Sequence, residues 1–147
     1  MRRFRFTLES VLTVREKALE NARIQLASIT NIYNKQLDVL KEMQIALENI
    51  SQEAQNYMFD GNFNPSLIAN YTAFSNKIVF DIKTQEQIIE KTKIDLIKQQ
   101  KITQEAYVKV KSLEKLKEKQ LEQYNKELQQ EEFKLIDDIV NSKRSIA

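Results

Sequence analysis

The chain lacks most of the residues that catalytic and metal sites require. Its 147 residues include one glycine, one proline, and no cysteine, histidine or tryptophan. Zinc sites built on thiolate or imidazole, a cysteine nucleophile and a histidine-based catalytic triad are therefore excluded. A single glycine also excludes glycine-rich phosphate loops, which need several residues without a Cβ atom. The carboxylates have neither a nucleophile nor a metal-ligand partner beside them, so we expect no enzyme activity, no cofactor and no metal.

Charge and hydropathy give a second set of exclusions. The net charge is only +2 on 44 charged residues, so bulk electrostatics predict no nucleic-acid partner. The lysine-rich segment 91–119 contains Tyr107 as its one aromatic residue, which favours a solvated face or an acidic protein partner. The longest uncharged stretch, 61–76, holds four asparagines and two serines, too polar for a transmembrane helix. With no cysteine present, we expect a cytoplasmic protein.

What the chain does contain is helix-forming residues: Ala, Glu, Lys, Leu, Arg and Gln make up 75 of the 147. From Leu8, alternating steps of four and three residues meet thirteen apolar positions in fifteen, the spacing of a coiled-coil seam. Thr7 suits the N-cap, so we expect a first helix over about 7–58. The seam positions are Leu8, Leu12, Arg15, Leu19, Ala22, Leu26, Ile29, Tyr33, Gln36, Leu40, Met43, Leu47, Ile50, Ala54 and Tyr57.

The only glycine and the only proline lie together in one predicted turn, 59–65. Gly61 suits a left-handed helix end, Asn64 an N-cap and Pro65 the first position of a second helix over about 65–141. One short connection between two long helices makes them antiparallel neighbours. We therefore expect an all-α fold, with 1–147 forming a single antiparallel coiled-coil hairpin that ends in a C-terminal helical overhang.

The predicted second helix has a more polar seam than the first, with seven apolar residues in eleven positions. After Leu113 the apolar pattern takes an extra four-residue step through Lys117 to Leu121, a stutter that locally unwinds a supercoil. The eleven positions are Ile78, Ile82, Gln85, Ile89, Thr92, Leu96, Gln99, Thr103, Ala106, Val110 and Leu113.

Because the second helix is longer than the first, residues 118–147 are expected to overhang the N-terminus. The apolar positions in this overhang have no expected partner within the chain, and such a stripe is typical of a surface that binds another protein. Self-association and a frayed tail remain alternatives. The positions are Leu121, Tyr124, Leu128, Leu135 and Ile139.

Two further segments are candidate binding surfaces. At the N-terminus three arginines alternate with two phenylalanines, which suggests either a docking tip or a simple helix lead-in; these are Arg2, Arg3, Phe4, Arg5 and Phe6. Near the turn, five aromatic residues form either an exposed patch or a plug that closes the hairpin; these are Phe59, Phe63, Tyr71, Phe74 and Phe80.

Both termini resemble the flagellar FliJ family. The N-terminal match is Phe4-Arg5-Phe6-Thr7-Leu8-Glu9-Ser10-Val11-Leu12 followed by Val14-Arg15-Glu16. The C-terminal match is Leu113-Glu114-Lys115-Leu116-Lys117-Glu118-Lys119, then Tyr124, Glu131-Glu132 and Asp137-Asp138-Ile139. The length and the two-helix layout agree as well, so the resemblance covers nearly the whole chain.

The resemblance implies a stalk of the flagellar type III protein export apparatus, similar to the central stalk of rotary ATPases. Its implied partners are the hexameric export ATPase, the membrane protein of the export gate and the export chaperones, at the cytoplasmic face of the inner membrane. The implied ATPase-docking residues are Arg2, Arg3, Phe4, Arg5, Phe6, Leu121, Tyr124, Leu128 and Leu135. The implied gate patch is Gln36, Leu40, Met43, Leu47, Tyr71, Phe74 and Ile78.

Two other functional classes stay open on the sequence. One is a self-associating structural coiled coil, and the other is the equivalent stalk of a virulence-type secretion system. A stalk predicts a monomer in solution, whereas a scaffold predicts a stable oligomer paired through the overhang.

Overall fold

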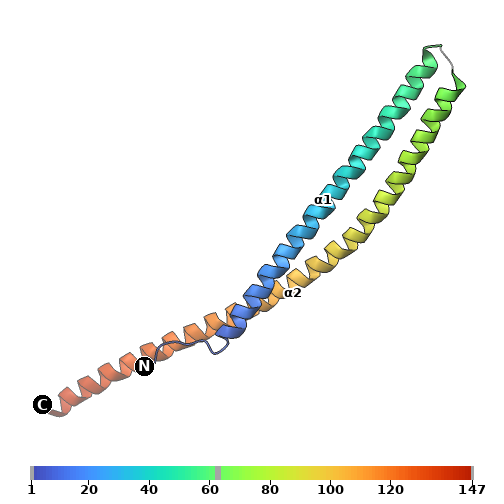
Figure 1. The fold of residues 1–147 in the computed structure, drawn as a ribbon. Coiled ribbons are helices and arrows are strands. Elements are labelled where there is room, and N and C mark those ends of the chain that lie inside the picture. Colours follow the sequence, from blue (N-terminus) through green and yellow to red (C-terminus); the bar gives the residue numbers. More distant parts are fainter. Residues whose placement is uncertain (1, 62–63, 147) are drawn as a thin grey trace. The chain divides into compact units, whose positions relative to one another are not determined.

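A computed structural model describes residues 2–61 and 64–146 (Figure 1). The described residues contain no strand and form two helices, α1 (Glu9–Phe59) and α2 (Pro65–Ile146), which pack against each other. The expected all-α fold of two long helices with a C-terminal overhang is confirmed. The expected helix limits are wrong at two ends: α1 begins at Glu9 rather than at residue 7, and α2 continues to Ile146 rather than ending near 141.

The chain divides into two compact units, each containing a segment of both helices. The terminal unit comprises Met1–Ala22 with Thr103–Ala147, and the turn unit comprises Arg23–Ile102. Within each unit the α1 and α2 segments run antiparallel and lie side by side (Figure 1).

The core of the terminal unit is a small apolar cluster. Its buried members are Phe6, Leu12, Leu19 and Val110, and Phe4, Leu8, Ala106 and Leu113 pack against it. Apart from Phe4 and Phe6, all of these residues are predicted seam positions, so the heptad spacing identified the contact face correctly.

The seam prediction holds along both helices. Every predicted seam position of α1 is buried or half-buried except Arg15, which is exposed because its long cationic side chain reaches water. In the turn unit the most buried seam residues are Ile78, Gln85, Ile89 and Gln99. All eleven predicted positions of α2 from Ile78 to Leu113 are likewise covered.

Two polar residues in the α2 seam donate hydrogen bonds to backbone carbonyls of α1, whereas Thr92 Oγ1 donates to the Ile88 carbonyl of its own helix. In the turn unit, Gln85 Nε2 donates to the Gln36 carbonyl at 3.0 Å. In the terminal unit, Thr103 Oγ1 donates to the Ala22 carbonyl at 3.3 Å. Each bond satisfies a polar side chain that would otherwise be costly inside the seam.

The turn adopts the conformation that its residues predict. Gly61 has a φ of 73°, the left-handed region that favours glycine after a helix end. Asn64 caps α2, because the Ser66 backbone N–H donates to Asn64 Oδ1 at 3.0 Å. Pro65 then occupies the first helical position, where its missing N–H costs nothing.

Candidate docking surfaces

The N-terminal strap, defined as residues 2–8, is the first candidate surface, and it differs from the expectation. Residues 2–6 have no regular secondary structure, residues 7 and 8 form a turn, and the Leu12 N–H donates to the Leu8 carbonyl at 2.9 Å to begin α1. Thr7 is therefore not the N-cap. The helix starts late because Phe6 is only 4% exposed and sits in the apolar cluster, which holds the preceding backbone along α2.

Three contacts fasten the strap to α2 within the terminal unit, and an ion pair joins α2 to Glu9 at the adjoining start of α1. The Phe4 and Tyr124 rings lie 5.5 Å apart between centroids at a tilt of 53°, a favourable aromatic arrangement. Tyr124 Oη donates to the Arg2 carbonyl at 2.7 Å. Lys117 Nζ lies 2.8 Å from the Glu9 carboxylate and 6.0 Å from the centre of the Phe6 ring.

The strap changes the pattern of covered residues on α2 after Leu113. The covered positions are Lys117, Gln120, Tyr124 and Leu128. The four-and-three spacing continues as far as Tyr124, and an extra four-residue step leads from there to Leu128. The extra step was predicted at Leu121, which is 40% exposed, so the predicted position of the stutter is wrong. Apolarity alone favoured Leu121 over Gln120, but the strap covers the side of α2 that carries Lys117 and Tyr124.

The overhang is consequently shorter than predicted. Tyr124 has partners within the chain, Leu128 is half-buried, and the expectation that both lack cover is wrong. The C-terminal tail, defined as residues 129–145, is exposed at every position, and among the described residues no segment lies beside it (Figure 1). Of the predicted stripe, Leu135 is 62% and Ile139 is 49% exposed.

The tail carries a second apolar face that the sequence prediction missed. Phe133, Ile136 and Val140 are 60%, 55% and 41% exposed. Their spacing of three and four residues places them on one side of the helix, about 110° around the axis from Leu135 and Ile139 at 100° per residue. That spacing is visible in the sequence, but these three residues lie off the stripe that continues from the seam.

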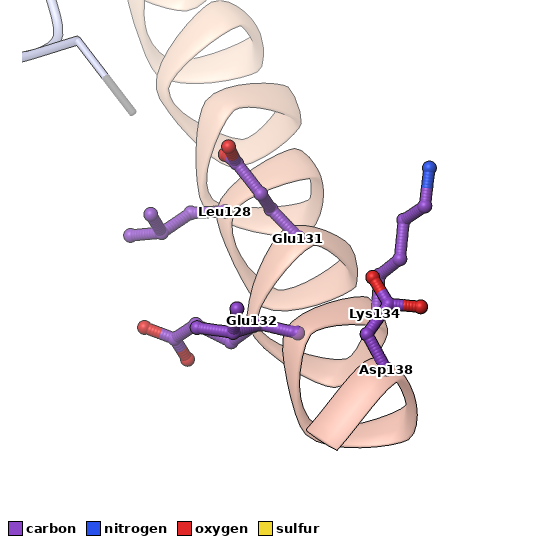
Figure 2. Close-up of a pocket in the computed structure, with 6 residues that line it drawn as sticks. Leu128, Glu131, Glu132, Lys134 and Asp138 are labelled. Atoms are coloured by element: carbon purple, nitrogen blue, oxygen red, sulfur yellow. The ribbon is translucent and has the colours of Figure 1, made fainter. Parts of the chain in front are cut away.

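A surface hollow of about 430 Å³ lies along the tail. All its lining residues belong to α2, and Figure 2 shows the carboxylates of Glu131, Glu132 and Asp138 pointing in different directions. A general acid and base need side chains that converge on one reacting atom, so this arrangement is a helix surface rather than a catalytic site. The lining residues are Leu128, Glu131, Glu132, Lys134, Leu135 and Asp138.

The strap presents its arginines to solvent while its aromatic rings face the protein. Arg2, Arg3 and Arg5 are exposed, and none of the three forms an ion pair with another described residue. Of the five predicted N-terminal docking residues, the three arginines are therefore accessible, whereas Phe6 is buried and Phe4 is half-buried.

The predicted gate patch lies mainly in the seam of the turn unit. Five of its seven residues are half-buried, namely Gln36, Leu40, Met43, Leu47 and Tyr71. Ile78 is 9% exposed, and Phe74, at 55%, is the one fully accessible member. A surface made by all seven would require the two helices to separate.

Of the described members of the predicted aromatic group near the turn, one is partly covered and three are exposed. Tyr71 packs against Tyr57, with ring centroids 6.2 Å apart, beside a hollow of about 330 Å³ whose nine lining residues are all uncharged. Phe59, Phe74 and Phe80 are 88%, 55% and 69% exposed, so these three form an accessible set rather than a plug. Phe63 lies outside the described residues.

The described residues offer neither a metal site nor a membrane-spanning segment. No group of three or more acidic, cysteine or histidine side chains is arranged to hold a metal ion among residues 2–61 and 64–146. Within the same ranges, neither helix has a segment long and apolar enough to cross a membrane. The candidate surfaces are therefore the strap, the tail and the exposed aromatic residues of the turn unit.

Comparison with known proteins gives one structural and one family match. The chain resembles the solved structure of a putative YscO homolog, CT670, from Chlamydia trachomatis, at 16% identity and a TM-score of 0.49, over 98% of this chain and 94% of that one. A comparison with curated proteins finds no match. The family model described as flagellar FliJ protein matches residues 4–144, which include all of α1, nearly all of α2 and most of the strap. The chain therefore belongs to the FliJ family, whose members are non-catalytic components of the flagellar type III export apparatus.

Proposed function

We propose that the protein is a stalk and adaptor of the flagellar export apparatus that docks on the hexameric export ATPase through its C-terminal tail and strap. The observation that carries this proposal is the tail itself. Five large apolar side chains are exposed within seventeen residues of a continuous helix, a density that marks a protein-binding surface. They are Phe133, Leu135, Ile136, Ile139 and Val140.

The placement of these residues favours a partner that surrounds the tail. A second helix in a two-stranded coiled coil covers one stripe, as α1 does for α2 elsewhere in this chain. The tail has two apolar faces, one through Leu135 and Ile139 and the other through Phe133, Ile136 and Val140. The central opening of a ring contacts a helix on several sides and covers both faces.

The second proposed contact is with the membrane protein of the export gate, and it lies in the turn unit. Phe74 is the accessible member of the residues that the family resemblance assigns to the gate. It lies on α2, the same helix that carries the tail. A partner bound at Phe74 and a partner bound at Leu135 would therefore be linked through one continuous helix, which is a direct route for coupling.

The proposed role is mechanical. The stalk would make different contacts with the ATPase ring in its different nucleotide states and so transmit that state to the gate. The export chaperones are further proposed partners. On this proposal the protein acts at the cytoplasmic face of the inner membrane through its partners. A self-associating scaffold is the competing function, and a concentration-dependent mass in analytical ultracentrifugation would support it over a monomeric stalk.

Truncation after Leu128 tests the ATPase contact, because it removes the tail and leaves the strap and Tyr124 in place. We expect this variant to lose most of its affinity for the hexameric ATPase and its stimulation of ATP hydrolysis. The control is Lys77→Gln, an exposed lysine of the turn unit with no ion pair among the described residues, which should bind normally. Full binding by the truncated chain would show that the tail is not the docking element.

A further inference from the structure

The basic and the aromatic side chains of the strap lie on different sides of it. In an extended chain, successive side chains point to opposite sides, and Arg3-Phe4-Arg5-Phe6 follows that alternation. The two rings face α2, and the arginines remain in water without an ion pair among the described residues. A segment needed only to lead into a helix has no use for three unpaired guanidinium groups within four residues.

The strap is held firmly enough to position these charges. Phe6 is buried in the core cluster, Phe4 packs on Tyr124, and the Tyr124 hydroxyl binds the Arg2 carbonyl. These anchors lie at or beside each arginine. The side chains therefore extend from an ordered backbone, and a ligand that binds them does not have to order the chain first.

The strap and the segment of α2 beneath it carry a net positive charge. The strap with Glu9 carries three arginines against one acid, and residues 110–124 of α2 beneath it carry four lysines against three glutamates. The net charge of these two segments is +3, whereas the whole chain has +2. The remaining residues sum to −1, although residues 91–109 carry five lysines against two acids. The strap region is therefore one of two positive regions that attract an anionic surface, and the only one of the two with exposed arginines.

The position of the rings decides which kind of anion fits. Binding to single-stranded nucleic acid uses aromatic rings that stack on bases, but Phe6 is buried and Phe4 is occupied by Tyr124. Insertion into a membrane needs apolar side chains beside the basic ones, and both phenylalanines face inward. Carboxylates need only the exposed forks of the guanidinium groups, which they bind in a bidentate manner.

We propose that the strap is a preorganised recognition element that binds a carboxylate-lined protein surface through Arg2, Arg3 and Arg5, with Phe4 and Phe6 as its anchors. This inference rests on the proposed function for the identity of the partner, which is the export ATPase ring, and it requires carboxylates on the part of the ring that faces the strap. The tail supplies apolar contact, and the strap supplies the charge contacts beside it.

Binding of the full chain to the purified hexameric ATPase, measured at 50 mM and 200 mM NaCl, tests this proposal. We expect Arg2→Gln, Arg3→Gln and Arg5→Gln together to weaken binding about tenfold to a hundredfold at low salt, since three charge-assisted pairs are lost. The matched control replaces Lys77, Lys83 and Lys91, three exposed lysines of the turn unit, with Gln and should change binding less than about threefold. Replacing the three arginines with Lys should give an intermediate loss, because charge is kept and bidentate geometry is not.

The outcomes separate this inference from the proposed function. If the triple Gln variant binds like the parent while Leu135→Glu with Ile139→Glu abolishes binding, the strap proposal is overturned and the docking proposal stands. If the parent chain does not bind the ATPase, both are overturned. Arginine-dependent binding to a 20-nucleotide single-stranded RNA, or to vesicles containing 30% phosphatidylglycerol, with no effect on the ATPase, would overturn the choice of a protein surface. Circular dichroism should show unchanged helix content in every variant, because all the altered residues are exposed.

Discussion

Replacement of Phe6 by alanine measures how strongly the strap is held on α2. The Phe6 side chain is 4% exposed and contacts a cluster that contains Leu12, Leu19 and Val110. Truncating a buried phenylalanine in a protein core costs about 3–5 kcal/mol of unfolding free energy, part of it from the cavity left behind. The strap is a chain end and can detach locally, so its own docking free energy limits the loss. We therefore expect a destabilisation of about 2–3 kcal/mol.

The change in unfolding free energy is measured by urea unfolding, monitored by circular dichroism at 222 nm. Phe80→Ala is the matched control. Phe80 is 69% exposed, so the same truncation removes little buried surface there. Alanine also has a higher helix propensity than phenylalanine by about 0.5 kcal/mol, which offsets the small loss. The control should therefore unfold within about 0.5 kcal/mol of the parent chain.

Amide hydrogen exchange locates the effect. The Leu12 N–H, bonded to the Leu8 carbonyl at the start of α1, should exchange faster in Phe6→Ala, and amides of the turn unit should not change. If Phe6→Ala is no more destabilising than Phe80→Ala, the strap is not seated in solution. That result would refute the burial argument and remove the basis for an ordered arginine face.

Three further predictions concern single sites. Gln36→Leu should stabilise the protein by about 1 kcal/mol, because Gln36 Oε1 is buried with no hydrogen-bond partner among the described residues. The bond from Gln85 goes to the Gln36 backbone carbonyl, which the substitution retains. Thermal unfolding measures the effect, and a lower melting temperature would contradict the prediction. Gly61→Ala should cost about 1 kcal/mol, since φ is 73° and no described residue other than the chain neighbours lies within 4 Å of an added Cβ, so backbone strain is the expected penalty; Gly61→Asn should cost less, and equal costs would argue against a left-handed turn. Tyr124→Phe should speed tryptic cleavage after Arg2 and Arg3, measured by mass spectrometry, because the bond to the Arg2 carbonyl is lost; an unchanged rate would show that this bond does not order the strap.

The sequence predicts the fold well because the fold follows from local rules. The heptad spacing depends only on which side chains avoid water, and it located the covered face of α1 at every seam position but Arg15. Gly61 identifies the turn because few other residues tolerate a φ of 73°, and Pro65 identifies it because proline is accepted at a helix start but not in a helix interior.

The strap was not predictable in the same way, because its conformation depends on contacts between residues more than a hundred positions apart. Thr7 is a good N-cap locally, but Phe6 gains more by packing near Val110, and the helix starts later. The same contacts selected Gln120 over Leu121 as a covered position and gave Tyr124 a partner. The gate assignment, taken from the resemblance, and the heptad spacing both claimed Leu40, Met43 and Leu47, and the structure half-buries these three residues in the seam.

Photo-crosslinking from the two proposed contact sites tests the central claim most directly. A photoreactive phenylalanine analogue replaces Leu135 in one variant and Phe74 in another, and each full chain is mixed with the hexameric ATPase and the cytoplasmic part of the gate protein. The account predicts that the probe at 135 labels the ATPase and the probe at 74 labels the gate. Labelling of a second copy of the chain from position 135, with no ATPase labelled, would contradict the stalk and favour a self-associating coiled coil.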